Sequence, residues 1–266
     1  MISTTLDNET YHAHKALGST TAKLVLTSRQ LLKDAIDGIY SLGHKPCFDI
    51  GTVSHTMVLE PDEFAKLFTS EGPINPKTGN MYGRGTKAFL EWQEQNPGLT
   101  VVEPFLWRML ERMPQELREV FALPGIAESS VIVDNDGWQA KCRPDWLCDT
   151  VIYDYKTIDN IDNIHKQTDN LHYDFSAEWY KDVMKMETGK THTHELIFAE
   201  KKPPHRWRIL KPDLEDVMLA QDQYFTAKEV INTAFKTGEW SDQSEVVVDW
   251  ERPSFSKIHE EYDYAL

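Results

Sequence analysis

Two short segments contain the residue types best suited to catalysis. Pro144-Asp145 comes first, and after eight intervening residues the chain reads Asp154-Tyr155-Lys156. Side chains at alternate positions of a strand lie on the same face, so a strand here places Asp154 and Lys156 together. A turn at residues 149–150 would bring Asp145 to the same point. Two carboxylates and an ammonium group are costly to bring together without a ligand, and hard oxygen ligands favour a divalent metal such as Mg²⁺.

An alternative interpretation is an exposed hairpin on which Asp154 and Lys156 form a weak ion pair, worth about 0–1 kcal/mol. An Asp-x-Lys pattern alone is common and favours this interpretation. A Pro-Asp pair followed by a predicted strand with an apolar residue, Asp, any residue and Lys is much rarer. The complete pattern therefore supports a metal site about as well as it supports the ion pair.

With their surroundings, these segments resemble a known nuclease family. Pro144-Asp145 and Asp154-Tyr155-Lys156 resemble the PD-(D/E)XK signature, and the wider sequence is similar to the RecE-type exonucleases (exodeoxyribonuclease VIII) of phage recombination systems. The resemblance covers roughly residues 25–240, and the stretches that carry it are 49–55, 58–64, 87–90, 127–130, 142–145 and 154–157. Together these stretches are far more specific than any one of them.

The resemblance implies a set of site residues and a cofactor. Lys156 would orient or activate the attacking water. Mg²⁺ is the implied cofactor, with Mn²⁺ as a substitute, because a phosphodiester must have its charge neutralised before water can attack it. The implied metal ligands are His55, Glu128, Asp145 and Asp154, together with the carbonyl of Tyr155.

Some candidate ligands also have a purely structural interpretation. His55 lies near the end of an apolar helical stripe, where a buried core histidine is common. Glu128 begins a predicted strand, where a carboxylate is usually solvated. His192 and His194 alternate along another predicted strand, and an exposed edge strand explains this pair as well as a metal site does.

The activity that the resemblance implies is hydrolysis of linear double-stranded DNA from its ends. Digestion would run 5′→3′ and leave 3′ single strands for recombination by strand annealing. The implied partners are duplex ends, further copies of the chain in a ring-like homo-oligomer, and a single-strand annealing protein. The family often carries Gln-x-x-x-Tyr on the helix after the core strands. Here Ser176 stands in place of the glutamine, while Tyr180, on the same helix face, can still reach the site.

Two further segments could contact the DNA backbone. Arg84 and Lys87 lie beside a loop at residues 70–85 that is rich in glycine and proline. Arg206 and Arg208 belong to the most basic segment of the chain, residues 201–208. A solvated hairpin tip explains this basic segment equally well. Tyr180 completes the set of predicted DNA contacts.

The net charge argues against long-range attraction to nucleic acid. The chain has 28 Lys and Arg against 43 Asp and Glu, a formal charge of −15. A protein held to DNA by its overall charge is expected to be basic. Any DNA contact must therefore use a local basic groove, bridging divalent cations, or both.

The composition excludes several classes of protein. The longest apolar runs are far shorter than the roughly 20 residues that a membrane span requires, and the first residues lack the pattern of a signal peptide. Three scattered cysteines exclude a disulfide framework and a four-cysteine zinc or iron–sulfur site within one chain. We expect a soluble, cytoplasmic protein without membrane partners.

The pattern of elements predicts an α/β protein with a restriction-endonuclease-like core, in which a central mixed sheet is flanked by helices. We expect a single nuclease domain over residues 1–266, with a mainly helical part at 1–125, a β-rich catalytic core at 126–211 and a long helix at 212–237. Expected helices begin at Thr27 or Ser28 and near Phe48, and others cover 106–121 and 173–187. The expected strands are 128–134, 138–142, 148–155, 193–199 and 206–210.

Two other functions fit parts of this pattern. A RecB-like or Cas-type nuclease component commonly carries an iron–sulfur cluster on four cysteines, so three cysteines argue against that version. A non-catalytic module that binds DNA ends on a decayed nuclease fold is consistent with Ser176. The intact Asp145, Asp154 and Lys156 argue against it.

Overall fold

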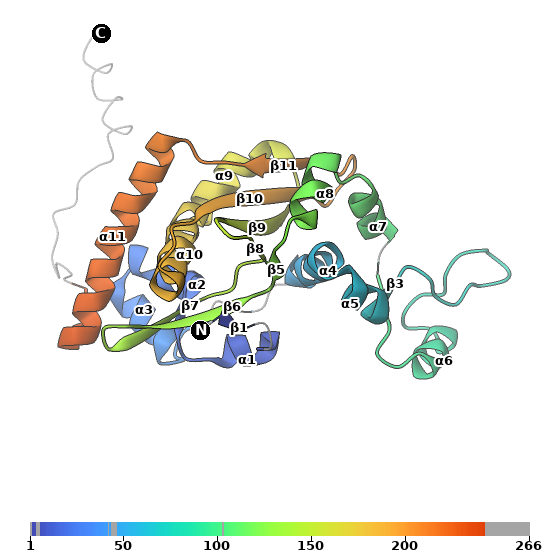
Figure 1. Cartoon of the computed structure of the whole chain (residues 1–266). Helices are drawn as coiled ribbons and strands as arrows, with labels where there is room; N and C mark the ends of the chain where they lie inside the picture. Colours follow the sequence, from blue (N-terminus) through green and yellow to red (C-terminus); the bar gives the residue numbers. More distant parts are fainter. Residues whose placement is uncertain (1, 4–5, 42, 44–46, 103, 243–266) are drawn as a thin grey trace, which may run out of the picture.

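The computed structural model describes residues 2–3, 6–41, 43, 47–102 and 104–242 of the 266-residue chain (Figure 1). As predicted, Ser28 begins a helix: its hydroxyl accepts a 3.0 Å hydrogen bond from the amide of Leu31. The helices of the first 122 residues are α1 (Asn8–Ala13), α2 (Ser19–Ala22), the 3-10 helix η1 (Lys23–Leu26), α3 (Arg29–Ile36), α4 (Cys47–Leu59), α5 (Pro61–Leu67), α6 (Lys87–Gln95), α7 (Pro104–Glu111) and α8 (Gln115–Ala122).

The predicted continuous helix over 106–121 is wrong. Helix α7 ends at Glu111 and α8 begins at Gln115, with Pro114 as its N-cap residue. Proline has no amide hydrogen and its ring clashes with the preceding helical turn, so one helix cannot pass through this position unbroken. The apolar positions nevertheless face one core, since Leu106, Met109 and Leu117 are all buried in the same cluster.

The strands form two main sheets. The first has the order β1-β6-β7-β2 and the second the order β11-β10-β9-β8-β5, while β3 (Phe68–Thr69) and β4 (Thr100–Val101) pair separately. The bounds are β1 (Ile2–Ser3), β2 (Leu17–Gly18), β5 (Ile126–Ala127), β6 (Ser130–Asn135), β7 (Trp138–Cys142), β8 (Trp146–Leu147), β9 (Val151–Ile158), β10 (Thr193–Glu200) and β11 (Trp207–Leu210). The predicted α/β architecture is confirmed, with its strands divided between two sheets.

One ribbon of chain runs through both sheets. Strands β6 and β7 pair as a hairpin closed at Asp136-Gly137, both of which have positive φ, as the sequence of the turn predicts. Farther along the same ribbon, β5 pairs with β8 in the second sheet. The pairing is interrupted at residues 128–129 on one side and 143–145 on the other. These interruptions place Glu128 and Asp145 at the crossing between the sheets.

Strand β10 lies inside the second sheet. It pairs in parallel with β9 along its whole length, from Thr193 opposite Val151 to Glu200 opposite Ile158, and antiparallel with β11 on its other side. The expectation that His192 and His194 belong to an exposed edge strand is therefore wrong, and both are buried. Strand β11 pairs with β10 from Leu196 to Ala199, and the ring of His194 packs against Tyr180 of α10.

Two long helices and the α4–α7 region cover the sheets. Helix α10 (Tyr173–Thr188) packs on β6 and β7, and α11 (Leu214–Thr237) packs on α10 (Figure 1). The indole of Trp179 on α10 donates a 3.0 Å hydrogen bond to the carbonyl of Lys141, which ties this helix to β7. On the other side, α4 packs against α7 and β9 through a core that includes Met57 and Met109. Within the described residues, no helix is long and apolar enough to cross a bilayer.

Candidate metal centre

Three predicted ligands converge where the ribbon crosses between the sheets. One donor atom from each of His55, Glu128 and Asp145 lies within 4.8 Å of the others. The Nδ1 atom of His55 is 3.6 Å from Oε1 of Glu128 and 3.7 Å from Oδ1 of Asp145. The three residues come from α4 and from the two interruptions of the ribbon, so only the folded chain assembles them.

Glu128 owes its position to an unusual backbone conformation. Its φ is +48°, in the left-handed region that non-glycine residues rarely occupy. The amide of Glu128 donates to the carbonyl of Asp145 across the ribbon at 3.1 Å. The sequence predicts that Glu128 starts a strand, but β6 begins two residues later, at Ser130. Backbone strain of this kind persists when the surroundings over-determine it, and it is concentrated at functional sites.

Arg143 fixes the Glu128 carboxylate. Its Nε donates to Oε2 of Glu128 at 2.7 Å, and its Nη1 donates to the carbonyl of Leu6 and the hydroxyl of Ser130, both at 3.2 Å. Burial opposes ionisation of Glu128, but hydrogen bonds and charge from His55 and Arg143 outweigh it and lower the pKa of the carboxyl. The other oxygen of Glu128 therefore faces His55 as a carboxylate.

Asp145 is tied to the strand that carries the second acidic segment. Its Oδ2 accepts a 2.6 Å hydrogen bond from the amide of Tyr155 on β9. The pairing of β8 with β9 brings this about, with Trp146 opposite Tyr153. The predicted return of the chain toward Asp154 is thus confirmed. Burial is the main cause of the raised pKa of Asp145, although the charges of His55 and Lys156 act in the opposite direction.

Asp154 and Lys156 form a pair beside this cluster. The Lys156 ammonium donates to Oδ1 of Asp154 at 2.7 Å and to the carbonyl of Tyr155 at 3.3 Å, and it lies 3.8 Å from Oδ2 of Asp145. Burial alone would favour the neutral form of both groups. The positive charge of Lys156 outweighs this effect and lowers the pKa of Asp154 to about 2. Asp154 and Asp145 likewise raise the pKa of Lys156 despite its burial. Both groups are charged at neutral pH.

His55 is held at the cluster by α4 and by an aromatic contact. Its ring packs edge-on against the ring of Tyr155, with centroids 5.0 Å apart, and the Tyr155 ring in turn stacks on Trp207. Burial lowers the pKa of His55, but the neighbouring Asp145 and Glu128 outweigh burial and raise it. The histidine is therefore neither a simple core residue nor solvated.

The donor set fits a hard divalent cation. Carboxylate oxygens from Glu128 and Asp145 and an imidazole nitrogen from His55 face one point, and the carboxylate of Asp154 lies next to Asp145. An Mg²⁺ or Mn²⁺ ion accepts such oxygen-rich donor sets and contacts phosphate through its remaining positions. The fold thus offers a candidate metal centre with an ammonium group beside it.

Of the two residues on α10 that the sequence singled out, Tyr180 lies near the site. Ser176 is buried, and the ring of Tyr180 packs edge-on against His194, with centroids 5.8 Å apart. Burial raises the pKa of the Tyr180 hydroxyl, and the negative charges of Asp154 and Asp145 contribute to this rise. Tyr180 therefore lies on the metal-centre side of α10, as its helix face predicts.

The structure places the four predicted basic DNA contacts elsewhere. Arg84 donates to the carbonyl of Val101 at 2.9 Å, and Lys87 lies on α6, 3.6 Å from Glu91. Arg206 binds Glu200 and Asp162, and Arg208 donates to the carbonyl of Trp207 at 2.8 Å. None of the four contacts the three-ligand cluster, and their roles in DNA binding stay predictions.

Sequence reasoning missed three residues that surround the site. Arg143 was visible only as part of the Arg-Pro-Asp segment, and nothing in the sequence links it to Glu128. The ring of Tyr173 lies between two cations, with its centre 5.5 Å from the ammonium of Lys23 and 5.7 Å from that of Lys156. Lys23 belongs to η1, about 130 residues before Lys156. Only the fold brings it near the site.

Comparison with known proteins agrees with this geometry. Residues 18–248 match the family described as "PDDEXK-like domain of unknown function (DUF3799)", and no curated protein matches the chain. Among solved structures, a candidate exonuclease from Eubacterium rectale is similar, with a TM-score of 0.58 and 14% identity over 95% of this chain and 97% of that one. At this identity the likeness concerns the fold. The chain belongs to the PDDEXK-like domain family DUF3799 and has the restriction-endonuclease-like α/β fold that its sequence predicts.

Proposed function

We propose that the protein is a Mg²⁺-dependent exonuclease that degrades linear double-stranded DNA. The observation that carries this proposal is the convergence of His55, Glu128 and Asp145 on one point, beside the charged pair of Asp154 and Lys156. Membership of a PDDEXK-like family supports the same chemistry. Metal ions held by ligands of this kind neutralise phosphate charge and activate water for phosphodiester hydrolysis.

Each residue has a distinct part in the proposed reaction. His55, Glu128, Asp145 and Asp154, with the carbonyl of Tyr155, would hold the metal. A bound divalent cation neutralises phosphate charge and lowers the pKa of water. Lys156 is protonated in the metal-free protein, so its ammonium acts as a donor that orients the attacking water or the scissile phosphate. Arg143 keeps Glu128 ionised and directed at the cluster.

The finer features rest on resemblance to the RecE-type exonucleases. We propose 5′→3′ digestion that leaves 3′ strands, a ring-like homo-oligomer around the duplex, and a single-strand annealing protein as partner. A ring would also reconcile the net charge of −15 with DNA binding, because acidic residues would face outward and a few basic ones would line the channel. Light scattering tests this oligomer: a mass equal to that of a monomer at micromolar concentration would contradict the proposed ring.

The most direct test is digestion of linear duplex labelled at either the 5′ or the 3′ end. We expect early release of the 5′ label as mononucleotides in Mg²⁺ and none in EDTA. A covalently closed circle of the same sequence should survive, because an exonuclease requires an end. Tight binding to duplex ends without hydrolysis in Mg²⁺ or Mn²⁺ would instead identify the non-catalytic end-binding module.

A further inference from the structure

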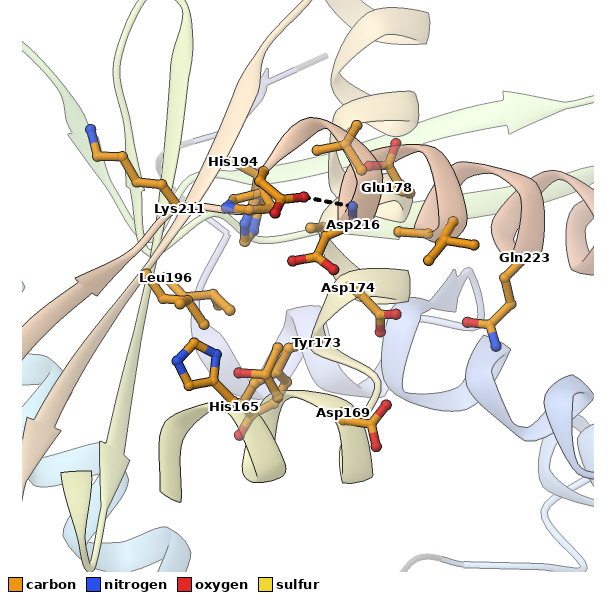
Figure 2. Close-up of a pocket in the computed structure, with 18 of the residues that line it drawn as sticks. His165, Asp169, Tyr173, Asp174, Glu178, His194, Leu196, Lys211, Asp216 and Gln223 are labelled. Carbon is orange, nitrogen blue, oxygen red and sulfur yellow. Dashed lines mark hydrogen bonds between the residues drawn. The ribbon is translucent and has the colours of Figure 1, made fainter. Parts of the chain in front are cut away.

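A second cavity of about 750 Å³ lies outside the metal centre (Figure 2). It is an open pocket bordered by α9 (Ile164–Asn170), α10, the first turns of α11 and strands β10 and β11. None of His55, Glu128 and Asp145 lines it. Its size is that of a small-molecule site.

The charged side chains that line the cavity are mostly acidic. The one Lys or Arg among its lining residues, Lys211, is paired with Glu195 at 2.9 Å, and its side chain points away in Figure 2. Asp213 caps α11, and Glu178 is paired with Lys181. The other four lining carboxylates, Asp169, Asp174, Asp216 and Asp222, have no ion pair within the described part of the chain.

Two buried polar atoms on the wall of this cavity lack a partner. The Nε2 atom of His194 and the Oδ1 atom of Asp174 have no hydrogen bond among the described residues. His194 is only 6% exposed. An imidazole that carries its proton on Nδ1 presents a lone pair at Nε2. A buried polar atom without a hydrogen-bond partner destabilises the protein. A ligand that donates hydrogen bonds would remove this cost.

The carboxylates are too dispersed for one metal ion. In the described ranges, only His55, Glu128 and Asp145 bring three such donors within reach of a single ion. Figure 2 shows Asp169, Asp174 and Asp216 entering the cavity from three different helices. Between them the wall is apolar, formed in part by Leu196, Leu210 and Val217. Separated negative groups joined by apolar surface match a chain of methylenes that carries several ammonium groups.

We propose that this cavity binds an aliphatic polyamine. Its ammonium groups would donate to Asp174, Asp216 and the Nε2 of His194, and its methylene stem would lie on Leu196 and Val217. The ring of Tyr173 lines the cavity and also faces the Lys156 ammonium.

The test is titration of the DNA-free protein with spermidine by calorimetry, in saturating Mg²⁺ and about 0.15 M salt, where exposed charges are screened beyond about 8 Å. We expect saturable binding at one site. Asp174→Asn and, separately, His194→Phe should each weaken the affinity about tenfold or more, because the first removes a negative charge and the second removes a hydrogen-bond acceptor. Asp136→Asn is the matched control. It removes one exposed carboxylate from a turn that asparagine tolerates, and the affinity should not change.

Because DNA is absent, this result does not depend on nuclease activity. Equal affinity in all four proteins would mean diffuse binding to an acidic surface and would overturn the proposal. Spermidine binding that is seen without Mg²⁺ but lost in saturating Mg²⁺ would also overturn the proposal, since the cavity would then hold an inorganic cation. The thermal unfolding midpoint of each variant identifies any that does not fold. If Asp174→Asn fails this check, the His194→Phe variant decides the question.

Discussion

The amide of Tyr155 donates a 2.6 Å hydrogen bond to Oδ2 of Asp145, which joins the interruption of one ribbon to the strand that carries Asp154 and Lys156. The bond leaves Oδ1 of Asp145 facing His55, 3.7 Å from its Nδ1. One oxygen of the Asp145 carboxylate therefore makes a structural hydrogen bond, while the other faces the candidate metal position. This arrangement fixes the orientation of Asp145 before a metal binds.

Replacement of Asp154 by alanine should abolish DNA cleavage and leave binding to duplex ends largely intact. The change removes a proposed metal ligand and leaves Lys156 without its closest partner. We expect activity to fall at least about a hundredfold, the scale for loss of one key electrostatic group. Digestion of linear duplex and a gel-shift assay with EDTA measure the two effects. Asp149→Ala, in the exposed turn before β9, is the control and should digest normally.

Replacement of Arg143 by glutamine should weaken metal binding. Arg143 orients Glu128 and keeps it ionised, and loss of a residue that orients a ligand typically costs about 10–100-fold in metal affinity or activity. Calorimetry with Mn²⁺ measures the affinity directly. A raised Mg²⁺ concentration should restore much of the digestion rate, which a merely misfolded protein would not show. Unchanged affinity would contradict the role assigned to Arg143, and Arg108→Gln on the exposed face of α7 is the control.

The ion pair of Glu200 and Arg206 should make stability depend on pH in the acid range. The hydrogen bonds from Arg206 are the main cause that lowers the pKa of Glu200 to about 2, from an ordinary value of 4.5. A group with a lowered pKa in the folded state stabilises the protein above its unfolded pKa, and loses that contribution as the pH falls toward the folded pKa. The contribution should thus be complete above about pH 4.5 and decline toward pH 2.

Urea unfolding of the wild type and Glu200→Gln from pH 6 to pH 2.5 tests this expectation. The difference between their free energies of unfolding should be constant at the upper end and shrink as the pH falls below 4.5. Glu116→Gln, on the exposed face of α8, serves as the control. A difference that stays constant over the whole range would show that Glu200 does not titrate as the structure implies.

The part of the site formed by residues close in sequence could be predicted, because the alternation of side chains along a strand and the geometry of a short turn depend on only a few neighbouring residues. These rules place Asp154 beside Lys156 and bring Asp145 close to both. The left-handed conformation of Glu128 does not follow, since its sequence is compatible with a continuing strand. The structure instead breaks the pairing of the ribbon at that residue, where the chain passes from one sheet to the other.

Contacts between distant segments account for most of what the sequence does not predict. Lys23 reaches Tyr173 through packing of the N-terminal helices, and His194 is buried against Tyr180 of α10. The break at Pro114 could have been read from the sequence, because proline inside a helical pattern ends the helix. The apolar periodicity on both sides of it hid the break, as both short helices face the same core.

Lys156 offers the sharpest test of the proposed chemistry. Its ammonium donates to Asp154 and lies 3.8 Å from Asp145, and it lies over the ring of Tyr173, 5.7 Å from the ring centre. Arginine keeps the positive charge but presents a planar fork and does not release its proton. It therefore cannot place one compact donor on a water or a phosphate oxygen in this space. We expect Lys156→Arg and Lys156→Ala both to be nearly inactive.

The ion-pair interpretation of Lys156 makes the opposite prediction. If the lysine served only to neutralise Asp154 and Asp145, arginine would do so equally well, and digestion of linear duplex would proceed at nearly the wild-type rate. Calorimetry with Mn²⁺ on the same variant separates the two causes of inactivity. Metal binding retained without digestion assigns Lys156 to the reaction itself, because the ligands are then intact and only the positioned donor has changed. If the Lys156→Arg variant still digested linear duplex, Lys156 would not be a catalytic residue.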